Sequence, residues 1–362
     1  MENMVMHTLF NGVYTNKRVL VTGHTGFKGS WLVKWLQLMG AEVIGYAQKA
    51  DTMPSHFELL NLDMPSVIGD ITDRKKLSEL FTEYKPQIVF HLAAQALVRA
   101  SYKDPLETFR VNIMGTATLL EVCRESASVE AVINVTSDKA YENREWEWGY
   151  RETDTIGGHD PYSASKGCSE LLTASYQNSF FKTKLLASCR AGNVIGGGDW
   201  SEDRLVPDII KAIQKEEEVV LRNPNATRPW QHVLEPLSGY LLVGQKLLEH
   251  QKESATAWNF GPNETGNISV ENVLLNIQTF YPALSYKIET DEQNPHEANL
   301  LKLDCSKAHR YLQWKSVWNT QKTFEKTALW YKKFYELGQI DTINDIKVYV
   351  KDAKKERLIW AI

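Results

Sequence analysis

A tyrosine and a lysine four residues apart carry acid–base chemistry. They stand in Tyr162-Ser163-Ala164-Ser165-Lys166, at the start of a stretch whose pattern predicts a helix over 162–180. At this spacing both side chains share one helix face. A lysine ammonium beside a phenol favours the phenolate and lowers a pKa that is ordinarily about 10. We therefore expect Tyr162 to act as a base toward a hydroxyl group, with Lys166 supporting it.

A second ionisable group of residues follows an apolar run over 131–136. It reads Ser137-Asp138-Lys139, and the run before it predicts a buried strand. The carboxyl ends of strands line the ligand crevice of a doubly wound sheet. Ser137 is then expected to hydrogen-bond the reacting hydroxyl beside Tyr162, with Asp138 and Lys139 at the same edge. An ordinary surface turn is the alternative interpretation of these three residues.

Glycines at three-residue spacing follow the first predicted strand. The segment 22–29 reads Thr-Gly-His-Thr-Gly-Phe-Lys-Gly and opens a predicted helix. Such glycines allow a tight turn, approach of the backbone to a pyrophosphate, and close helix–sheet packing. A helix N-terminus also offers free N–H groups and partial positive charge to phosphates. The expected cofactor contacts in this loop are Gly23, Thr25, Gly26, Phe27, Lys28 and Gly29.

The ribose-binding position of a dinucleotide site is less distinct. NAD enzymes commonly place a carboxylate at the end of the second strand. Here that strand ends near Tyr46, no carboxylate follows until Asp51, and Lys49 would suit a 2′-phosphate. Asp70, with Ile71 beside it, ends the third strand and is expected to reach the adenine; a helix N-cap is the other interpretation of Asp70.

The elements that must position these residues alternate between short apolar runs and longer helical patterns. The predicted strands are 18–22, 42–46, 66–70, 87–93, 131–136 and 185–190. The predicted helices are 30–39, closed by Gly40, and 74–84, 106–126 and 162–180. This order predicts an α/β fold, a Rossmann-type doubly wound parallel sheet with right-handed connections.

The character of the chain changes after Asn193. We expect residues 1–195 to form the dinucleotide-binding Rossmann domain, with segments near 230–265 returning to it. Residues 196–362 are expected to form mainly a smaller mixed α/β substrate-binding domain. The charged tail beyond about residue 340 predicts a surface helix.

Composition excludes several classes of partner. The net charge of −4 shows no basic block, which argues against nucleic acid. No apolar stretch approaches the roughly 20 residues of a membrane helix, and no leader pattern is visible. The four cysteines, Cys123, Cys168, Cys189 and Cys305, form no C-x-x-C pair. We expect a reduced cytoplasmic enzyme with no membrane association and no metal site.

With these residues in view, the chain resembles the extended short-chain dehydrogenase/reductase superfamily over nearly its whole length. Within it, the sequence is similar to the sugar-nucleotide 4,6-dehydratases. The segments His91-Leu92-Ala93-Ala94-Gln95, Asn112 to Thr116 and Arg228 to Val233 fit this resemblance. Members acting on dTDP-glucose carry Thr-Asp-Glu where this chain has Ser137-Asp138-Lys139. The branch of the family that acts on CDP-glucose is similar to this chain at residues 137–139, where the chain differs from the dTDP-glucose type. It is also similar at 22–32 and at 228–242.

The resemblance implies NAD as cofactor and a nucleotide sugar, CDP-glucose, as substrate. It implies oxidation at C4, loss of water across C5 and C6, and return of hydride to C6, a lyase reaction of deoxysugar biosynthesis for O-antigen. It adds Leu92, Ala93 and Ala94 to the cofactor site. It places asparagine and arginine at the sugar diphosphate, and the matching candidates are Asn193, Arg204 and Arg228. His296 is a candidate nucleotide contact or a surface-loop residue, and Arg190 is either a diphosphate contact or a structural ion-pair residue.

Lys139 departs from the glutamate that serves as C5 base in the dTDP-type enzymes. An ammonium must lose its proton before it can be a base, and burial favours that loss. Alternatively Lys139 stabilises the enolate and Asp138 handles the protons alone.

Two other functions fit the same residues. A nucleotide-sugar 4-epimerase needs the glycine loop, Ser137, Tyr162 and Lys166 but not the pair at 138–139. A non-catalytic NAD-sensing regulator would use the fold alone. The resemblance further implies a homodimer or tetramer, with a four-helix interface expected from 106–126 and 162–180, in particular Leu119-Leu120 and Leu171-Leu172.

Overall fold

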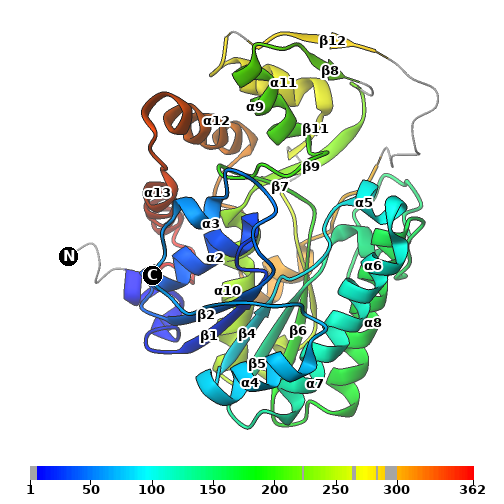
Figure 1. Ribbon diagram of the computed structural model, residues 1–362, viewed down its shortest axis with the longest axis vertical. Helices are drawn as coiled ribbons and strands as arrows, with labels where there is room; N and C mark the ends of the chain where they lie inside the picture. The colour runs from blue at the N-terminus through cyan, green and yellow to red at the C-terminus, as the bar shows by residue number, and fades with distance from the viewer. Residues whose placement is uncertain (1–5, 222–223, 263–265, 283, 290–299) are drawn as a thin grey trace.

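A twisted sheet of parallel strands forms the lower part of the computed structural model (Figure 1). The structure describes residues 6–221, 224–262, 266–282, 284–289 and 300–362. The sheet has seven strands in the order β10-β6-β5-β4-β1-β2-β3, and every neighbouring pair is parallel. The strands are β1 (Arg18–Thr22), β2 (Glu42–Ala47), β3 (Ser66–Ile68), β4 (Ile88–His91), β5 (Ala131–Val135), β6 (Leu185–Ala191) and β10 (Ala257–Phe260). The predicted Rossmann-type fold class is confirmed.

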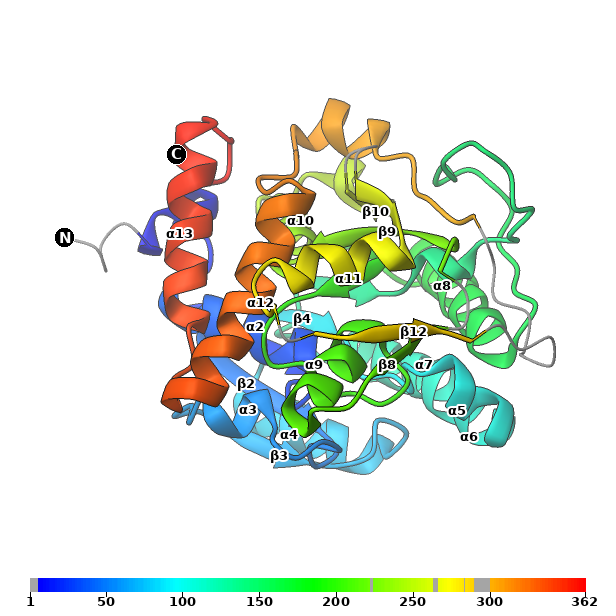
Figure 2. The same ribbon diagram turned by 90° about the horizontal axis from the view of Figure 1, so that it is seen from above.

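Helices cover both faces of this sheet because its strands carry apolar residues on both sides. In β1, Val19 and Val21 join one apolar cluster and Leu20 joins the other. The first cluster packs under α2 (Phe27–Leu38) and α10 (Leu234–Leu248), and the second under α4 (Arg74–Tyr84) and α7 (Gly115–Glu125). Figure 2 shows these layers from above, with α8 (Pro161–Ser179) beside α7.

Two predicted helices differ in detail from the structure. Helix α2 begins at Phe27 rather than Ser30, because Gly26 is already its N-cap. The predicted helix over 106–126 is divided into α6 (Pro105–Phe109), a π-helical turn (Arg110–Met114) and α7. Leu119 and Leu120 are fully buried in the chain's own core. The expectation that they lie in a subunit interface is therefore wrong. Apolar residues that pack a helix against a sheet have the same sequence pattern as apolar residues of an interface.

Smaller elements lie above the carboxyl edge of the sheet (Figure 1). A sheet of three strands has the order β11-β9-β7, and β12 pairs with β8. The bounds are β7 (Asn193–Ile195), β8 (Val219–Leu221), β9 (Thr227–His232), β11 (Asn267–Ser269) and β12 (Tyr286–Ile288), with α9 (Leu205–Lys215) and α11 (Val270–Gln278). From the second half of the chain, α10 and β10 lie within the Rossmann layers. The domain boundary near residue 195 stays a prediction.

The C-terminal helix α13 (Thr342–Lys355) packs beside α2, whereas α12 (Thr320–Leu337) packs against α11 and β9. The tail is more than a surface helix: Ile346, Tyr349, Val350 and Ala353 form a buried face of α13. These apolar residues recur at helical spacing, which is typical of a helix with one buried face. The expectation of a surface helix considered only the charged residues around them. Tryptophans from several elements share this core, as in the stacking of Trp360 on Phe10, with ring centroids 5.1 Å apart. No helix in the described parts of the chain could cross a membrane.

Candidate active site

Helix α8 presents the predicted tyrosine and lysine to the sheet. The Asp160 side chain caps the helix by accepting from the Ser163 backbone N–H at 2.9 Å, and Pro161 occupies the first turn. Tyr162 and Lys166 are both buried, and Lys166 Nζ donates to the Val135 carbonyl at 3.5 Å. Because Val135 ends β5, this contact joins the helix to the strand that precedes Ser137.

The Ser137-Asp138-Lys139 segment forms a tight turn at the end of β5. Ser137 Oγ donates to Asp138 Oδ1 at 2.9 Å and accepts from the Lys139 backbone N–H at 3.2 Å. The Asp138 carboxylate is buried and lies against Gly192, where a β-carbon would stand 2.9 Å from Oδ2. The Lys139 side chain is only partly buried and forms no salt bridge in the described part of the chain. A buried carboxyl group and a partly buried lysine side chain thus stand on one turn.

The electrostatics of Tyr162 differ from the expectation based on spacing. Burial raises the pKa of its phenol, while a hydrogen bond with Ser137 and the positive charge of Arg204 lower it, and the net shift is upward. Burial also lowers the pKa of Lys166, to about 8. The expectation that Lys166 lowers the pKa of Tyr162 below its ordinary value is wrong here, because burial removes hydration from the phenolate.

The glycine loop between β1 and α2 is built for close backbone approach. Gly23 has φ +73°, and a β-carbon there would stand 2.7 Å from the Ala93 backbone N. At Gly29 a β-carbon would stand 2.1 Å from the Gly23 carbonyl oxygen. No side chain caps α2, so its first N–H groups point toward the loop. Two tight glycine positions and a helix N-terminus without a side-chain cap fit a pyrophosphate, and therefore a dinucleotide.

Lys28 joins this loop to the catalytic groups. Burial lowers the pKa of Lys28 to about 7; the positive charges of Arg204 and Lys166 act in the same direction, and Asp138 opposes them. These four residues come from α2, the start of α9, α8 and the turn after β5. The charges of Arg204, Lys166 and Asp138 all act on Lys28, so these members of the predicted substrate and catalytic sets lie near the glycine loop. Thr25, by contrast, faces the β2 end, where its hydroxyl donates to the Gln48 carbonyl at 3.0 Å.

The far end of the dinucleotide site carries an ion pair. Arg110 Nη2 stands 2.8 Å from Asp70 Oδ2, and this arginine holds the pKa of Asp70 down at about 2. Asp70 is not the N-cap of α4, which is Asp73. Ile71 is buried against Gly115, and the Tyr46 hydroxyl donates to the Asp70 carbonyl at 2.8 Å. The Asp70 carboxylate therefore stays ionised and half-exposed at the carboxyl edge of the sheet.

The predicted substrate residues lie above that edge. Arg204 precedes α9, and its Nη1 stands 3.8 Å from Asp199 Oδ2. Asn193 begins β7 and pairs with Trp230 of β9, the strand that also carries Arg228. His296 lies outside the described residues. Arg204 thus lies near enough to Tyr162 and Lys28 for its charge to lower the pKa of each, and Asn193 and Arg228 lie on neighbouring strands.

Sequence reasoning missed several residues that hold the site. Asn112, in the π-helical turn, donates to Ser165 Oγ at 2.8 Å and accepts from the Gln95 backbone N–H at 2.8 Å. Glu170 was also missed: its Oε2 stands 2.7 Å from Nη2 of Arg190, and both side chains are buried, which supports the ion-pair interpretation given above for Arg190. Glu170 follows Lys166 by four residues, so the helical spacing that identified Tyr162 would also have identified it.

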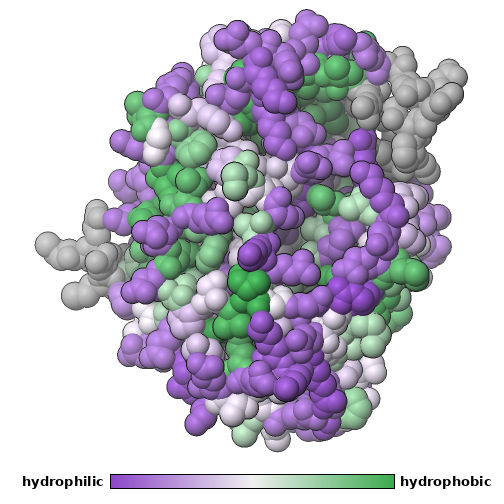
Figure 3. Space-filling model, in the orientation of Figure 1, coloured by the Kyte–Doolittle hydropathy of each residue, from purple (hydrophilic) through white to green (hydrophobic). Residues whose placement is uncertain are grey.

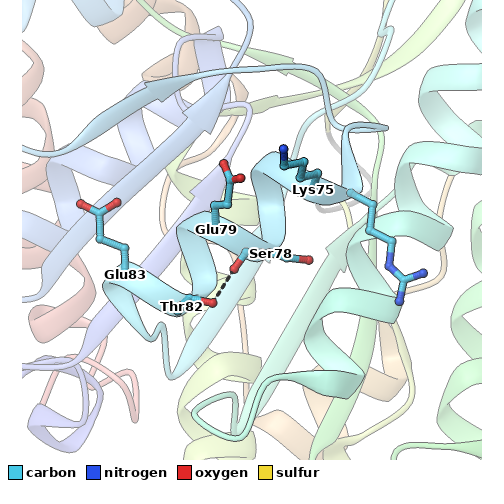
Figure 4. A pocket seen from close by; sticks show the side chains of 6 residues that line it. Lys75, Ser78, Glu79, Thr82 and Glu83 are labelled. Atoms are coloured by element: carbon cyan, nitrogen blue, oxygen red, sulfur yellow. Dashed lines mark hydrogen bonds between the residues drawn. The ribbon is translucent and has the colours of Figure 1, made fainter.

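A shallow depression on the outer face of α4 lies elsewhere (Figure 4). Its lining side chains fan outward from one helix; they are Arg74, Lys75, Ser78, Glu79, Thr82 and Glu83. None of the predicted site residues lines it. Among the described residues no group of three or more histidine, cysteine, aspartate or glutamate side chains could hold a metal ion.

Comparison with known proteins gives consistent matches. The family model described as GDP-mannose 4,6 dehydratase matches residues 20–327. A CDP-glucose 4,6-dehydratase of Salmonella typhimurium is 50% identical over 328 residues, which cover 88% of this chain and 91% of that protein. A probable dTDP-glucose 4,6-dehydratase of Sinorhizobium fredii is 27% identical, covering 87% and 92% of the two chains.

Among solved structures, a dTDP-glucose 4,6-dehydratase from Streptomyces venezuelae with NAD bound has a TM-score of 0.76. It is 22% identical, and the match covers 87% of this chain and 97% of that one. A UDP-glucose 4-epimerase from Brucella ovis in complex with NAD has a TM-score of 0.74 at 22% identity, covering 86% and 98%. At these identities the solved structures establish the fold alone.

Proposed function

The chain belongs to the GDP-mannose 4,6 dehydratase family, and we propose that within this family it converts CDP-glucose to CDP-4-keto-6-deoxyglucose. The 50% identity to a CDP-glucose 4,6-dehydratase, spread over nine-tenths of that protein, carries the choice of substrate. The Ser137-Asp138-Lys139 turn is consistent with it, because an elimination needs ionisable groups that an epimerisation does not. The proposed pathway is deoxysugar biosynthesis for O-antigen.

The reaction conserves the cofactor. NAD, when bound, would supply the transfer of hydride from C4 to C6, so that the substrate loses one water with no net change of the cofactor. The glycine loop fits its pyrophosphate, with backbone N–H groups from the first turn of α2. Asp70 and Ile71 would lie at its adenine end, and Leu92, Ala93 and Ala94 after β4.

In the oxidation step the chain moves one proton. Tyr162 takes the proton of the C4 hydroxyl, and Ser137 orients that hydroxyl. Lys166 keeps a positive charge next to the phenolate and holds the nicotinamide ribose. The pKa of the Tyr162 phenol is raised by burial, with Ser137 and Arg204 opposing it. Deprotonation therefore depends on these hydrogen bonds and charges, which act where the phenolate forms.

In the elimination step the turn after β5 acts. The 4-keto group acidifies the C5 proton; we assign its removal to the Asp138 carboxylate, which passes it to the departing C6 hydroxyl, so that water is released. When hydride returns to C6, C5 takes up a proton, which balances the one that Tyr162 removed from the C4 hydroxyl. We assign to Lys139 the stabilisation of the enolate oxygen by its positive charge. Asn193, Arg204 and Arg228 would hold the diphosphate, because guanidinium groups bind phosphate oxygens through paired N–H donors.

The proposal is tested by incubating the protein with CDP-glucose, dTDP-glucose or GDP-mannose, each with NAD or NADP, and following the product masses. Loss of one water from CDP-glucose with NAD supports it. Loss of water from another nucleotide sugar would keep the mechanism and reject the substrate. An unchanged mass with an inverted C4 centre would identify an epimerase instead.

We also propose a homodimer, in the cytoplasm, without nucleic-acid or membrane partners. Exposed apolar side chains on α6, the π-helical turn and α8 support the dimer: Leu106 is 78%, Met114 56% and Leu171 61% exposed. On the face shown in Figure 3 hydrophobic residues appear in several separate groups, and one of these groups lies at the right edge, near α6 in Figure 1. Free cysteines, three of them buried, are typical of a reducing compartment. Sedimentation of wild type and Leu171→Glu tests the dimer, and a wild-type monomer would reject it.

A further inference from the structure

A buried ion pair lies directly behind the catalytic helix face. Glu170 follows Tyr162 and Lys166 on α8, at the same four-residue spacing. Its Oε2 stands 2.7 Å from Arg190 Nη2 of β6, and both side chains are only 4% exposed. Removing two charges from water is costly, and a buried pair of this kind is weak evidence for stability by itself. Its position beside the site calls for another explanation.

The pair binds both ends of the turn that carries the reacting groups. Glu170 accepts from the hydroxyl of Thr136, the residue before Ser137. Arg190 Nη1 donates to the Tyr141 hydroxyl at 2.6 Å, and its guanidinium lies 4.8 Å from the centre of that ring. Tyr141 directly follows the turn Asp138–Ala140. The segment from Ser137 to Ala140 is therefore fixed at both ends against α8 and β6.

The pair also sets the charge around Lys166. Burial lowers the pKa of Lys166 to about 8, and the Glu170 carboxylate opposes that shift. Burial likewise acts to raise the pKa of Glu170, but Arg190, Thr136 and Ser188 outweigh it and hold that pKa below its ordinary value. From the other elements around Lys166, the charge of Lys28 on α2 repels it, and His91 on β4 is neutral, since burial lowers its pKa to about 3. Glu170 is thus the counter-charge that favours a cationic Lys166.

We propose that Glu170 and Arg190 are positioning residues for the dehydration: they hold the Ser137–Asp138–Lys139 turn in register with Tyr162 and keep Lys166 cationic. This inference deepens the proposed function and rests on it. Neither residue touches the reacting atoms. Glu170 acts through Lys166 and Thr136, and Arg190 acts through Glu170 and Tyr141.

The test compares Glu170→Gln with wild type in two measurements. In turnover of CDP-glucose, kcat should fall about 10-fold or more, because proton transfer depends on positioned groups, while KM changes little. The alkaline limb of the pH profile should move to lower pH, since loss of the carboxylate makes the Lys166 cation easier to deprotonate. A titration of ¹³C-labelled lysines by NMR, with Lys166→Met to assign the signal, should show the same downward shift.

Two further variants separate the effects. Tyr141→Phe keeps both charges and removes only the hydroxyl that accepts from Arg190. Its kcat should therefore fall, while the alkaline limb of its pH profile should stay at the wild-type position. Glu170→Asp keeps the charge and should keep the alkaline limb near the wild-type position. Asp345→Asn is the matched control: it breaks another largely buried pair, Lys326 Nζ to Asp345 Oδ1 at 2.9 Å, between α12 and α13. It should cost stability and leave the pH profile unchanged.

Failure of this inference can be distinguished from a failure of the protein to convert CDP-glucose. The lysine titration needs no turnover, so it tests the counter-charge even if CDP-glucose is not converted. An unshifted Lys166 titration in Glu170→Gln overturns the inference. So does a Tyr141→Phe enzyme with the kcat of wild type, because the turn would then not depend on Arg190.

Discussion

The carboxylate of Asp138 lies against the backbone of Gly192, so close that a β-carbon at residue 192 would stand 2.9 Å from Asp138 Oδ2. Asp138 belongs to the turn after β5, and Gly192 connects β6 to β7. The missing side chain at residue 192 therefore makes room for the proposed acid of the elimination. This contact is more specific to water loss than to C4 oxidation, which depends on Tyr162 and Ser137.

Gly192→Ala should therefore impair elimination more than oxidation. The added methyl group displaces the Asp138 carboxylate by a few tenths of an ångström or more, and misplacement of a proton-transfer group can cost about 10-fold or more in rate. Rapid-quench analysis of one turnover should show the 4-keto-glucose intermediate accumulating. Gly261→Ala is the control, because its β-carbon would meet its nearest neighbour at an ordinary 3.4 Å. Equal slowing of both steps in Gly192→Ala would contradict this role.

Asp138→Asn should retain oxidation at C4 and lose elimination. An amide of the same shape cannot protonate the leaving hydroxyl, and a general acid typically contributes about 10²–10⁴-fold. Appearance of NADH without release of water in a single turnover is the expected result. If the variant dehydrates at the wild-type rate, another group supplies the proton, and the role of the turn must be reassigned.

The charge of Lys139 is predicted to matter more than its basicity. Its side chain is partly buried and forms no salt bridge among the described residues, so its charge is available to a developing enolate. Lys139→Met should slow exchange of the C5 proton with deuterated solvent by about 10²-fold or more, whereas Lys139→Arg should retain most of it. Exchange lost equally in both variants would identify Lys139 as the base.

Stability should depend on pH through Glu235 of α10. Its carboxylate accepts from the Val317 and Trp318 backbone N–H groups and from the Tyr349 hydroxyl, at 2.8–2.9 Å. Burial raises its pKa from 4.5 to about 7. The folded state then binds the extra proton, and the stabilisation that this gives is full below about pH 4.5 and lost as the pH rises through about 7.

The difference between these pKa values corresponds to about 3 kcal/mol in the free energy of unfolding. Urea unfolding at low and at neutral-to-alkaline pH should therefore show a steeper loss of stability with rising pH in wild type than in Glu235→Gln. Glu336→Gln, an exposed change on α12, serves as control and should keep the wild-type slope. Parallel slopes for wild type and Glu235→Gln would show that Glu235 does not titrate in this range.

Sequence patterns within single elements were enough to predict most of the Rossmann sheet and its helices. The apolar runs and helical periods predicted six strands and the main helices, since buried parallel strands and amphipathic helices have distinct sequence periods. The spacing of Tyr162 and Lys166, and that of Gly23, Gly26 and Gly29, is also local. Each of these is set within one element and its adjoining turn.

Contacts between distant segments could not be read in this way. The contact of Gly192 with Asp138 and the pairing of Arg110 with Asp70 depend on how strands and helices meet in space. The seventh strand, β10, begins more than 60 residues after β6 ends, and its pairing is a tertiary event. The upward pKa shift of Tyr162 likewise reflects burial, which no spacing reveals.

The central claim is an internal transfer of hydride from C4 to C6 of CDP-glucose. We would supply CDP-glucose carrying deuterium at C4, together with NAD, and locate the label in the product by NMR. The account predicts a 4-keto-6-deoxy sugar with deuterium on the C6 methyl group. Deuterium that stays on C4, in a product of unchanged composition, would contradict the account and identify an epimerase.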